Sequence, residues 1–445
     1  MIQRLSVPLL ALLSAAFMHA QPQATIYGDI IGKGGRPKLA VTDFKGAGAA
    51  AAFMSTFNGT LFSDLQKSGL FDMASKSYYP TAQPQSPNDF HPPGGAEIAP
   101  EWSGPPVNAS HLAFGYAADQ GGTFVLYGYL FDLHQSTIQG AQALAKRYFE
   151  TMNDDGARKG AHEFANDIIA FFGGGSLTGT KIYFVSNRGG SEEMWVMDYD
   201  GSNQHQLSHN RGINIMPAVS PDGSLVAFTS YRHGRPQIDI LETAGGRLRT
   251  FLNPDASVNA NPAFSPDGRF LYFASSLAGP EQIYRSTITG GGLTRISHSK
   301  AVETEPKVNP KNPNQLVFVS GRTGPEQVFM MNSDGLDVER LTDGTGEASN
   351  PCWHPDGQHI LFSWTRGYAK GDWNVFLMDV ASRRYDQLTH SEGRNENPVW
   401  APDGRHLVFG SNRSGSYQIW TMLADGTALT RLTNLGQNKQ PVWSK

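Results

Sequence analysis

The sequence is poor in cysteine, and this limits how the fold can be held together. Cys352 is the only cysteine among 445 residues, so the chain cannot form an internal disulfide and lacks the paired cysteines of common zinc sites. Cys352 lies in "NPCWHPDG", where similar segments carry Ala, Lys or Val, and we expect a small core residue rather than a reactive thiol. Stability must therefore come from a packed core.

Long apolar runs are also scarce. Only the first twenty residues, "MIQRLSVPLLALLSAAFMHA", place a basic residue before an apolar run and end in small residues, which is the layout of a secretory signal peptide. No later segment approaches the roughly 20 consecutive apolar residues of a membrane-spanning helix. The sequence predicts a signal peptide over residues 1–20 and an exported mature chain with no membrane span.

Neither charge nor catalytic motifs stand out. The 36 basic and 40 acidic residues give a formal net charge of −4, so no nucleic-acid partner is expected. No serine lies in a G-x-S-x-G motif, and "GKGGRP" and "GGGSLTG" lack the spacing of phosphate-binding loops. His205 and His209 have a separation that would suit a metal on a helix, but here they flank a short predicted strand, which favours surface positions. We predict no enzymatic activity, no cofactor and no metal.

The chain does contain a long internal repeat. Six prolines each open a similar unit, with successive spacings of 45, 44, 45, 47 and 43 residues: Pro217, Pro262, Pro306, Pro351, Pro398 and Pro441. Apolar strands in each unit are separated by Pro-Asp-Gly and Asp-Gly turns, which predicts four antiparallel strands per unit. Four-stranded units of this length are typical of β-propeller blades.

The two ends of the repeat indicate the number of blades. The segment 181–208 contains the second, third and fourth strands of a unit but lacks the first, whereas the final "PVWSK" contains only a first strand. Together the two ends make one blade, which joins five complete ones. We therefore predict a mainly β protein with a six-bladed β-propeller over residues 181–445, closed by the C-terminal strand.

The region before the propeller has a different pattern. Residues 37–44 read as a buried strand, and Phe53, Phe57, Leu61 and Leu65 recur at the four-residue spacing of a helix that ends near Gly69. Further strands follow, then a second amphipathic helix over residues 157–172, while the proline-rich segment 79–95 is expected to be an exposed loop. We predict a small α/β domain over residues 21–172 and a glycine-rich linker over 173–180.

This combination resembles the TolB family, the propeller component of the Tol-Pal cell-envelope system. The resemblance rests on "GRPKLAVTDF", "LFSDLQKSGLF" and "DGARKGAHEFANDII" before a six-blade repeat that ends in "PVWS". It implies a non-enzymatic periplasmic adaptor that supports outer-membrane integrity and cell division, and we expect a monomer.

Residues that differ between blades are candidates for recognition, because the scaffold does not dictate them. The loops before the repeat prolines border one mouth of the channel and are polar and largely uncharged, which suits a protein partner. In the TolB family, residues at this position contact Pal, the peptidoglycan-associated lipoprotein. By this resemblance the partner-binding candidates are Val258, Asn259, Thr304 and Glu305, and the polar loops of the mouth add Asn350, Glu396 and Asn397.

The start of the mature chain supplies a second candidate site. "ATIYGDII" alternates like a strand and precedes a glycine-rich hinge, a pattern that suits pairing with another chain as an added strand. The resemblance implies pairing with a TolA-like protein through Thr25, Ile26, Tyr27 and Asp29. A disordered tail is the alternative.

Positions that recur in most blades are interpreted as structural. The Pro-Asp-Gly aspartates, Asp222, Asp267, Asp356 and Asp403, are assigned to turns, and the arginines at 188, 232, 322, 366 and 413 to hydrogen bonds between blades. Two other functions stay open. One is a propeller hydrolase or lactonase that uses metal-binding groups in the channel, and the other is a propeller that binds peptidoglycan or sugar.

Overall fold

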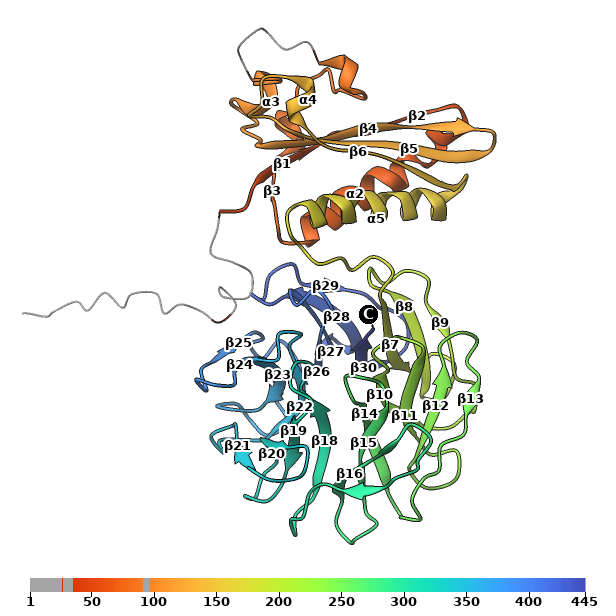
Figure 1. Ribbon diagram of the computed structural model, residues 1–445, viewed down its shortest axis with the longest axis vertical. Coiled ribbons are helices and arrows are strands. Elements are labelled where there is room, and N and C mark those ends of the chain that lie inside the picture. Colours follow the sequence, from red (N-terminus) through yellow and green to blue (C-terminus); the bar gives the residue numbers. More distant parts are fainter. Residues whose placement is uncertain (1–25, 27–34, 91–96, 445) are drawn as a thin grey trace, which may run out of the picture.

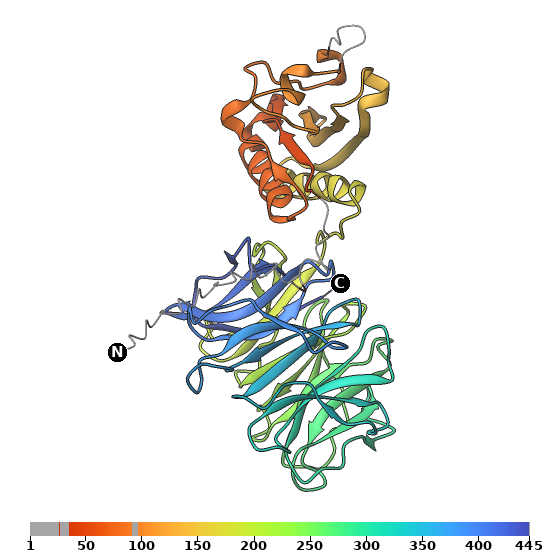
Figure 2. The same cartoon turned by 90° about the vertical axis from the view of Figure 1, so that its left-hand side faces the viewer.

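The computed structural model describes residues 26, 35–90 and 97–444. The predicted signal peptide, together with Thr25, Tyr27 and Asp29, lies outside the described residues. Two parts are visible: an α/β region above and a ring of small β-sheets below (Figures 1 and 2). No helix of the described ranges is long and apolar enough to cross a membrane.

The α/β region is built on one mixed sheet of order β3-β1-β4-β5-β6, in which β2 also pairs with β4. Its strands are β1 (Lys38–Val41), β2 (Lys45–Ala47), β3 (Asp72–Met73), β4 (His111–Gln120), β5 (Thr123–Asp132) and β6 (Gln142–Thr151). Strand β1 pairs in parallel with both neighbours, whereas β4, β5 and β6 are antiparallel.

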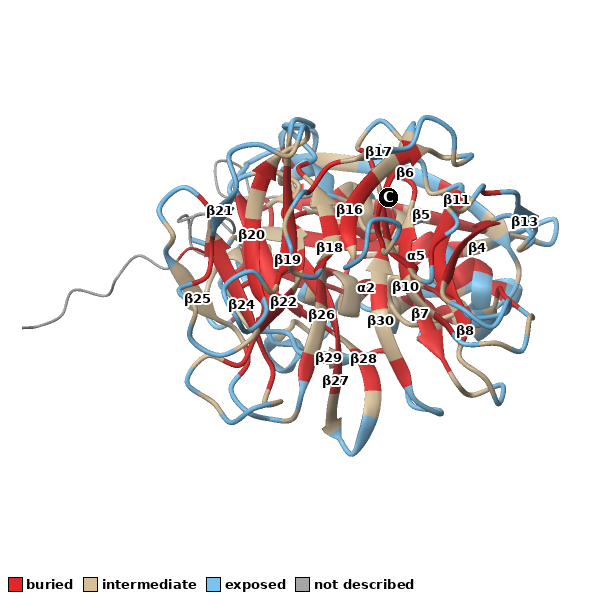
Figure 3. Ribbon diagram, turned by 90° about the horizontal axis from the view of Figure 1, so that it is seen from below, coloured by how far each residue is buried: buried red, intermediate tan, exposed pale blue. Residues whose placement is uncertain are grey.

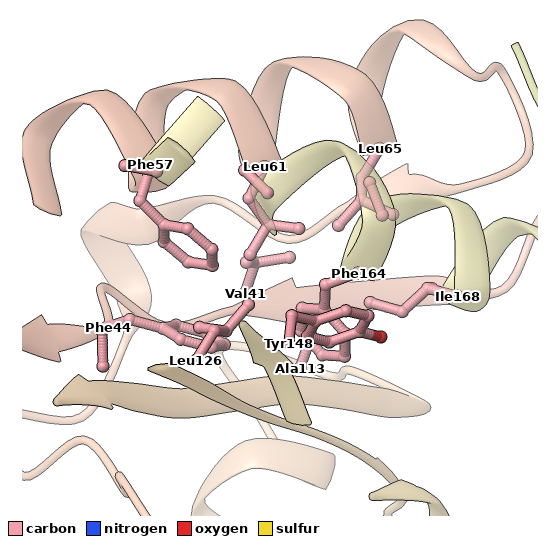
Figure 4. Packing of buried hydrophobic residues seen from close by; sticks show 14 of the residues in the cluster. Val41, Phe44, Phe57, Leu61, Leu65, Ala113, Leu126, Tyr148, Phe164 and Ile168 are labelled. Atoms are coloured by element: carbon pink, nitrogen blue, oxygen red, sulfur yellow. The ribbon is translucent and has the colours of Figure 1, made fainter. Parts of the chain in front are cut away.

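Two helices cover the face of this sheet that points toward the propeller. Helices α2 (Met54–Lys67) and α5 (Asp154–Phe171) bury the predicted apolar stripe, including Phe57 and Leu61, against strand residues such as Leu126 (Figure 4). The first helix begins later than its sequence pattern suggests, because residues Gly48–Phe53 form a 3₁₀ turn (η1).

The opposite face of the sheet corrects one prediction. The proline-rich segment was expected to be an exposed loop, yet Tyr79 and Phe90 pack in a buried cluster with Trp102 and Phe131. Short elements complete this cover: η2 (Lys76–Tyr78), η3 (Pro87–Asp89), α3 (Pro100–Ser103) and α4 (Ile138–Ala141). The segment packs inward because an uncovered face would leave the aromatic side chains of β4 and β5 in water.

The second part is the predicted six-bladed propeller, with one four-stranded sheet per blade. Blade 1 is β30 (Asn438–Trp443), β7 (Lys181–Ser186), β8 (Glu193–Asp198) and β9 (His205–Gln206). Blade 2 is β10 (Asn214–Val219), β11 (Leu225–Ser230), β12 (Gln237–Glu242) and β13 (Leu248–Arg249). Blade 3 is β14 (Asn259–Phe264), β15 (Phe270–Ser275), β16 (Gln282–Thr287) and β17 (Thr294–Arg295).

The remaining blades repeat the same order. Blade 4 is β18 (Glu303–Val308), β19 (Gln315–Ser320), β20 (Gln327–Asn332) and β21 (Glu339–Arg340). Blade 5 is β22 (Ala348–Trp353), β23 (His359–Trp364), β24 (Asn374–Asp379) and β25 (Tyr385–Gln387). Blade 6 is β26 (Asn395–Trp400), β27 (His406–Ser414), β28 (Ser416–Leu423) and β29 (Thr430–Arg431). The strands are largely buried and the loops exposed (Figure 3).

The C-terminal strand closes the ring as predicted. Strand β30 pairs antiparallel with β7, with Asn438 opposite Ser186 and Trp443 opposite Ile182. Trp443 Nε1 donates to Thr180 Oγ1 at 2.9 Å, so both ends of the propeller sequence meet in blade 1. The inner edge of blade 1 is therefore paired rather than open.

Helices α2 and α5 rest on the turns of blades 6 and 1. His406 Nε2 lies 2.8 Å from the carbonyl oxygen of Lys67, and Tyr199 donates to Asp64 Oδ2 at 2.8 Å. A cavity of about 60 Å³ lies between these groups. The α/β region is thus attached to the propeller by polar contacts as well as by the linker.

Candidate partner-binding site

The channel is lined by residues with an unusual backbone conformation. The residue before each repeat proline has a positive φ of 51–56°: Met216, Asn261, Glu305, Asn350, Asn397 and Gln440. At each of these positions the pairing of the innermost strand with its neighbour shifts register, as in a β-bulge. The bulge lets these residues project into the channel instead of alternating across the blade.

Several of these channel residues join one blade to the next. Asn350 donates its backbone N–H to Glu305 Oε2 at 2.6 Å, and Asn397 donates its own to Asn350 Oδ1 at 3.2 Å. In the same way Met216 donates to Gln440 Oε1 at 2.8 Å. The polar side chains in front of the prolines therefore brace adjacent blades, a role that the sequence did not indicate.

Glu305 has the most perturbed carboxyl group of the channel. Burial raises the pKa of Glu305 to about 7, the nearby Glu326 carboxylate adds to the rise, and the hydrogen bonds from Asn350 and the charge of Lys307 oppose it. A group with this pKa changes charge near neutral pH. The charge of the channel wall therefore depends on pH at blade 4.

A cluster of charges lies in the channel near blades 6 and 1. Arg394 pairs with Glu396 at 2.9 Å, Tyr417 donates to Glu396, and Lys439 lies 3.4 Å from Glu192. The channel encloses about 690 Å³. Its described lining contains two carboxylates, Glu305 and Glu396, and no histidine.

The structure brings most of the predicted partner-binding residues to this channel and its mouth. Glu305, Asn350, Glu396 and Asn397 line the channel. Thr304, which precedes Glu305, and Val258, in the loop that enters blade 3, are half-buried. Asn259 is different: its side chain is fully buried, accepting from Ser275 and donating to the carbonyl of Pro254. Asn259 therefore offers a partner no accessible side chain.

Sequence reasoning missed the apolar residues at this end of the propeller. Val302 is 44% exposed in the loop that enters blade 4, and Ile213 and Leu435 are similarly exposed in the loops that enter blades 2 and 1. Leu277 is exposed in the loop between β15 and β16, at the same end of blade 3. Apolar side chains beside polar ones are typical of protein interfaces. For Val302, Ile213 and Leu435, a position one to three residues before an innermost strand was the signal available in the sequence.

Of the predicted N-terminal candidates, only Ile26 is described. Its side chain is 2% exposed and lies between blades 5 and 6 with Leu361 and Met422, and its backbone N–H donates to Asp386 Oδ2 at 2.7 Å. Ile26 is thus docked on the propeller in this structure.

Two of the arginines between the second and third strands, Arg188 and Arg413, bond within their own blades, which corrects the prediction for these residues that they join neighbouring blades. Arg188 donates to Asn438 Oδ1 at 2.8 Å, and Arg413 donates to Asn395 Oδ1 at 2.8 Å. In each case the partner belongs to the innermost strand of the same blade. The guanidinium of Arg188 also lies over the Trp195 ring, 4.5 Å from its centroid.

Fold and channel together define a class: a six-bladed β-propeller that follows a small α/β region and has a polar, charged channel. The sequence profile of the TolB β-propeller domain matches residues 172–367 and 342–445, which is more than half of the chain. The chain therefore belongs to the TolB β-propeller family, as its resemblance predicted.

Individual relatives agree with this assignment. A TolB homolog of Chlorobium chlorochromatii is 36% identical over 142 residues, 32% of this chain and 31% of that protein. The Tol-Pal system protein TolB of Escherichia fergusonii is 28% identical over 242 residues, 54% of this chain and 52% of that protein. These alignments span about a third to a half of each relative.

A solved structure supports the fold over a longer range. The crystal structure of TolB from Acinetobacter baumannii aligns with a TM-score of 0.77 and 21% identity, covering 93% of this chain and 98% of that one. This likeness extends the agreement in fold to the α/β region.

Proposed function

We propose that this protein is a non-enzymatic periplasmic adaptor of the Tol-Pal type, which binds a Pal-like lipoprotein at the mouth of its propeller. The observation that carries the proposal is the combination of exposed apolar residues and polar channel residues at one end of the ring. Membership of the TolB family and the names of the Tol-Pal relatives support it.

Exposed apolar residues and charged residues occupy different blades at the mouth of the propeller. Val302 and Ile213 supply apolar contact area on blades 4 and 2, whereas Arg394, Glu396 and Lys439 supply charge on blades 6 and 1. Apolar contacts at a well-packed centre supply most of the binding free energy of an interface, and surrounding charges set specificity and the rate of association. A partner with apolar groups over blades 2 and 4 and complementary charges over the channel near blades 6 and 1 would fit this division.

The test is capture of a purified Pal-like lipoprotein. Val302→Arg together with Thr304→Arg should reduce capture at least tenfold with an unchanged thermal unfolding curve. The control is Leu336→Arg, which places the same charge on a residue that is 62% exposed at the opposite end of blade 4. Glu305 is left unchanged because its side chain braces Asn350. Capture equal to that of the control would refute docking at this mouth.

The second part of the proposal concerns the N-terminal segment, which we assign to a TolA-like partner that adds it as a strand. Because Ile26 is buried between blades 5 and 6, such pairing requires Ile26 to leave the propeller. Asp386→Ala removes the acceptor of the Ile26 N–H and should therefore increase binding of the TolA-like protein. Unchanged or weaker binding in a titration would count against this assignment.

A further inference from the structure

The turn between β22 and β23 in blade 5 gathers two histidines around one aspartate. His354 Nδ1 lies 2.9 Å from Asp356 Oδ1, and His359 Nδ1 lies 2.8 Å from Asp356 Oδ2. One ligand atom from each residue can be chosen so that all three lie within 4.8 Å of one another. Within residues 26, 35–90 and 97–444, no other group of three histidine, cysteine or acidic side chains has this property.

Comparison with the other blades shows that this arrangement is particular to blade 5. In blade 2 the position of His354 is held by Ser220, whose hydroxyl donates to Asp222 of the same turn at 2.5 Å. In blade 6 the aspartate and second histidine are kept, with His406 Nδ1 2.6 Å from Asp403 Oδ2, but Ala401 stands in place of the first histidine. The turn itself therefore needs no second imidazole.

The outer nitrogens of the two histidines are held by further acceptors. His354 Nε2 lies 2.8 Å from the carbonyl oxygen of Gly404, so this nitrogen carries the proton and donates it. Nδ1 of the neutral His354 imidazole is therefore unprotonated, and its lone pair faces Asp356. His359 Nε2 lies 3.5 Å from Asp379 Oδ2. Carbonyl and carboxylate groups on the far nitrogen are the partners that orient metal-bound histidines.

Charge and burial also suit a cation. His354 and His359 are only 7% and 9% exposed, whereas Asp356 is half-buried and open to solvent on one side. One carboxylate beside two imidazoles offers a divalent cation a negative charge and three donor groups.

We propose that His354, Asp356 and His359 bind one divalent transition-metal ion of the zinc class, with solvent as the fourth ligand. Two imidazoles and one carboxylate form a donor set that suits such ions. Ligand atoms around tetrahedral zinc lie about 3.4 Å apart. The side chains must therefore rotate slightly, so that the His–Asp contacts of 2.8 and 2.9 Å widen and any separation of up to 4.8 Å closes. The ion also replaces the hydrogen bond from the Asp356 backbone N–H to His354 Nδ1, which is 3.1 Å long.

The position of the site gives the ion a structural role. His354 contacts Gly404, which lies in the turn of blade 6 that also carries His406. Since His406 contacts the carbonyl of Lys67 in the α/β region, a bound ion would link the turn of blade 5 to the part of blade 6 that meets the α/β region. The metal site is thus distinct from the channel and its mouth.

Titration of the chelator-treated mature protein with Zn²⁺ alone tests the proposal. Calorimetry should show one tight equivalent per chain, and Co²⁺ should give the visible absorption of a four-coordinate site. His354→Ser inserts the residue that blade 2 has at this position, so the variant should keep the fold. It should no longer bind the tight equivalent of Zn²⁺, and Zn²⁺ should no longer raise its melting temperature. His205→Ser, at an exposed histidine elsewhere, should change none of these.

A second variant keeps the proposal testable if His354→Ser is unstable. Asp356→Asn retains a good turn residue but removes the charge, and it should weaken Zn²⁺ binding at least tenfold. Absence of a tight equivalent in the wild type would overturn the proposal. So would Zn²⁺ binding of wild-type affinity in either variant, because it would show that the ion binds at another histidine.

Discussion

Deletion of residues 440–445 tests how the propeller is closed. The deletion removes the end of β30, including Trp443, which is 9% exposed and packs with Ile182 and Phe184 of β7. It also removes the hydrogen bonds from Trp443 to Thr180 and between Ser444 and Lys181. Blade 1 would be left with an unpaired edge beside the channel.

The expected effect is large compared with the stability of a domain. Loss of a buried tryptophan costs about 3–5 kcal/mol, and the lost hydrogen bonds add about 1 kcal/mol each. Their sum approaches the roughly 5–15 kcal/mol by which whole domains are stable. At about 2–4 °C per kcal/mol for a domain of this size, the melting temperature should fall by about 10 °C or more.

Thermal unfolding followed by circular dichroism measures this effect. Trp443→Ala should give part of the loss, and Leu435→Ala, at a residue 64% exposed in the same region, should give almost none. A synthetic peptide of residues 438–445 should restore part of the stability of the truncated chain. If the truncated protein melted within about 2 °C of the intact one, β30 would not be what closes the ring.

Three further outcomes are expected. Burial lowers the pKa of His406, but the charge of the Asp403 carboxylate outweighs burial, so the folded-state pKa is raised above its usual value. Protonated His406 therefore stabilises the folded state. This contribution is fully present below the unfolded pKa of about 6.5 and is lost as pH rises through the folded pKa. The melting temperature of the wild type should therefore fall more between pH 6 and pH 9 than that of His406→Gln, and parallel curves would contradict this. Glu305 should titrate near pH 7 in a ¹³C NMR titration, and a midpoint below about 5 would show an unperturbed carboxyl. Gly69→Ala should lower the free energy of unfolding by about 1–2 kcal/mol, because the φ of Gly69 is +65° and a Cβ would lie 2.5 Å from a leucine of blade 6. Gly59→Ala, with open space around the new Cβ, should instead stabilise α2. Equal free energies of unfolding for the two variants in denaturant would refute this.

Much of the architecture could be predicted because it follows from local patterns. The prolines from Pro217 to Pro441 mark the blades, and the four-residue spacing of Phe57, Leu61 and Leu65 marks a helix face. The proline-rich segment around Phe90 was predicted wrongly because its burial depends on the uncovered face of a distant sheet. The proline content of a segment predicts turns in its own backbone, but it does not predict which other part of the protein the segment packs against.

The candidate sites were predictable only in part. Glu305 and Asn350 were placed at the channel by the repeat, but their hydrogen bond joins residues 45 positions apart and depends on the bulge in each innermost strand. Asn259 shows the reverse case, since its position in the repeat suggests a surface residue while its side chain is buried inside the blade. Asp356 was assigned to a turn, which is correct, although the same carboxylate also contacts two histidines.

The sequence by itself determined the number of blades, the closing role of "PVWSK" and membership of the TolB family, because each is written as a repeat or a motif along the chain. Only the tertiary structure decided that Ile26 docks between blades 5 and 6, and that His406 contacts Lys67 across 339 residues of sequence. The physical reason is that contacts between blades and between domains depend on how finished elements pack, and no single stretch of sequence contains both partners.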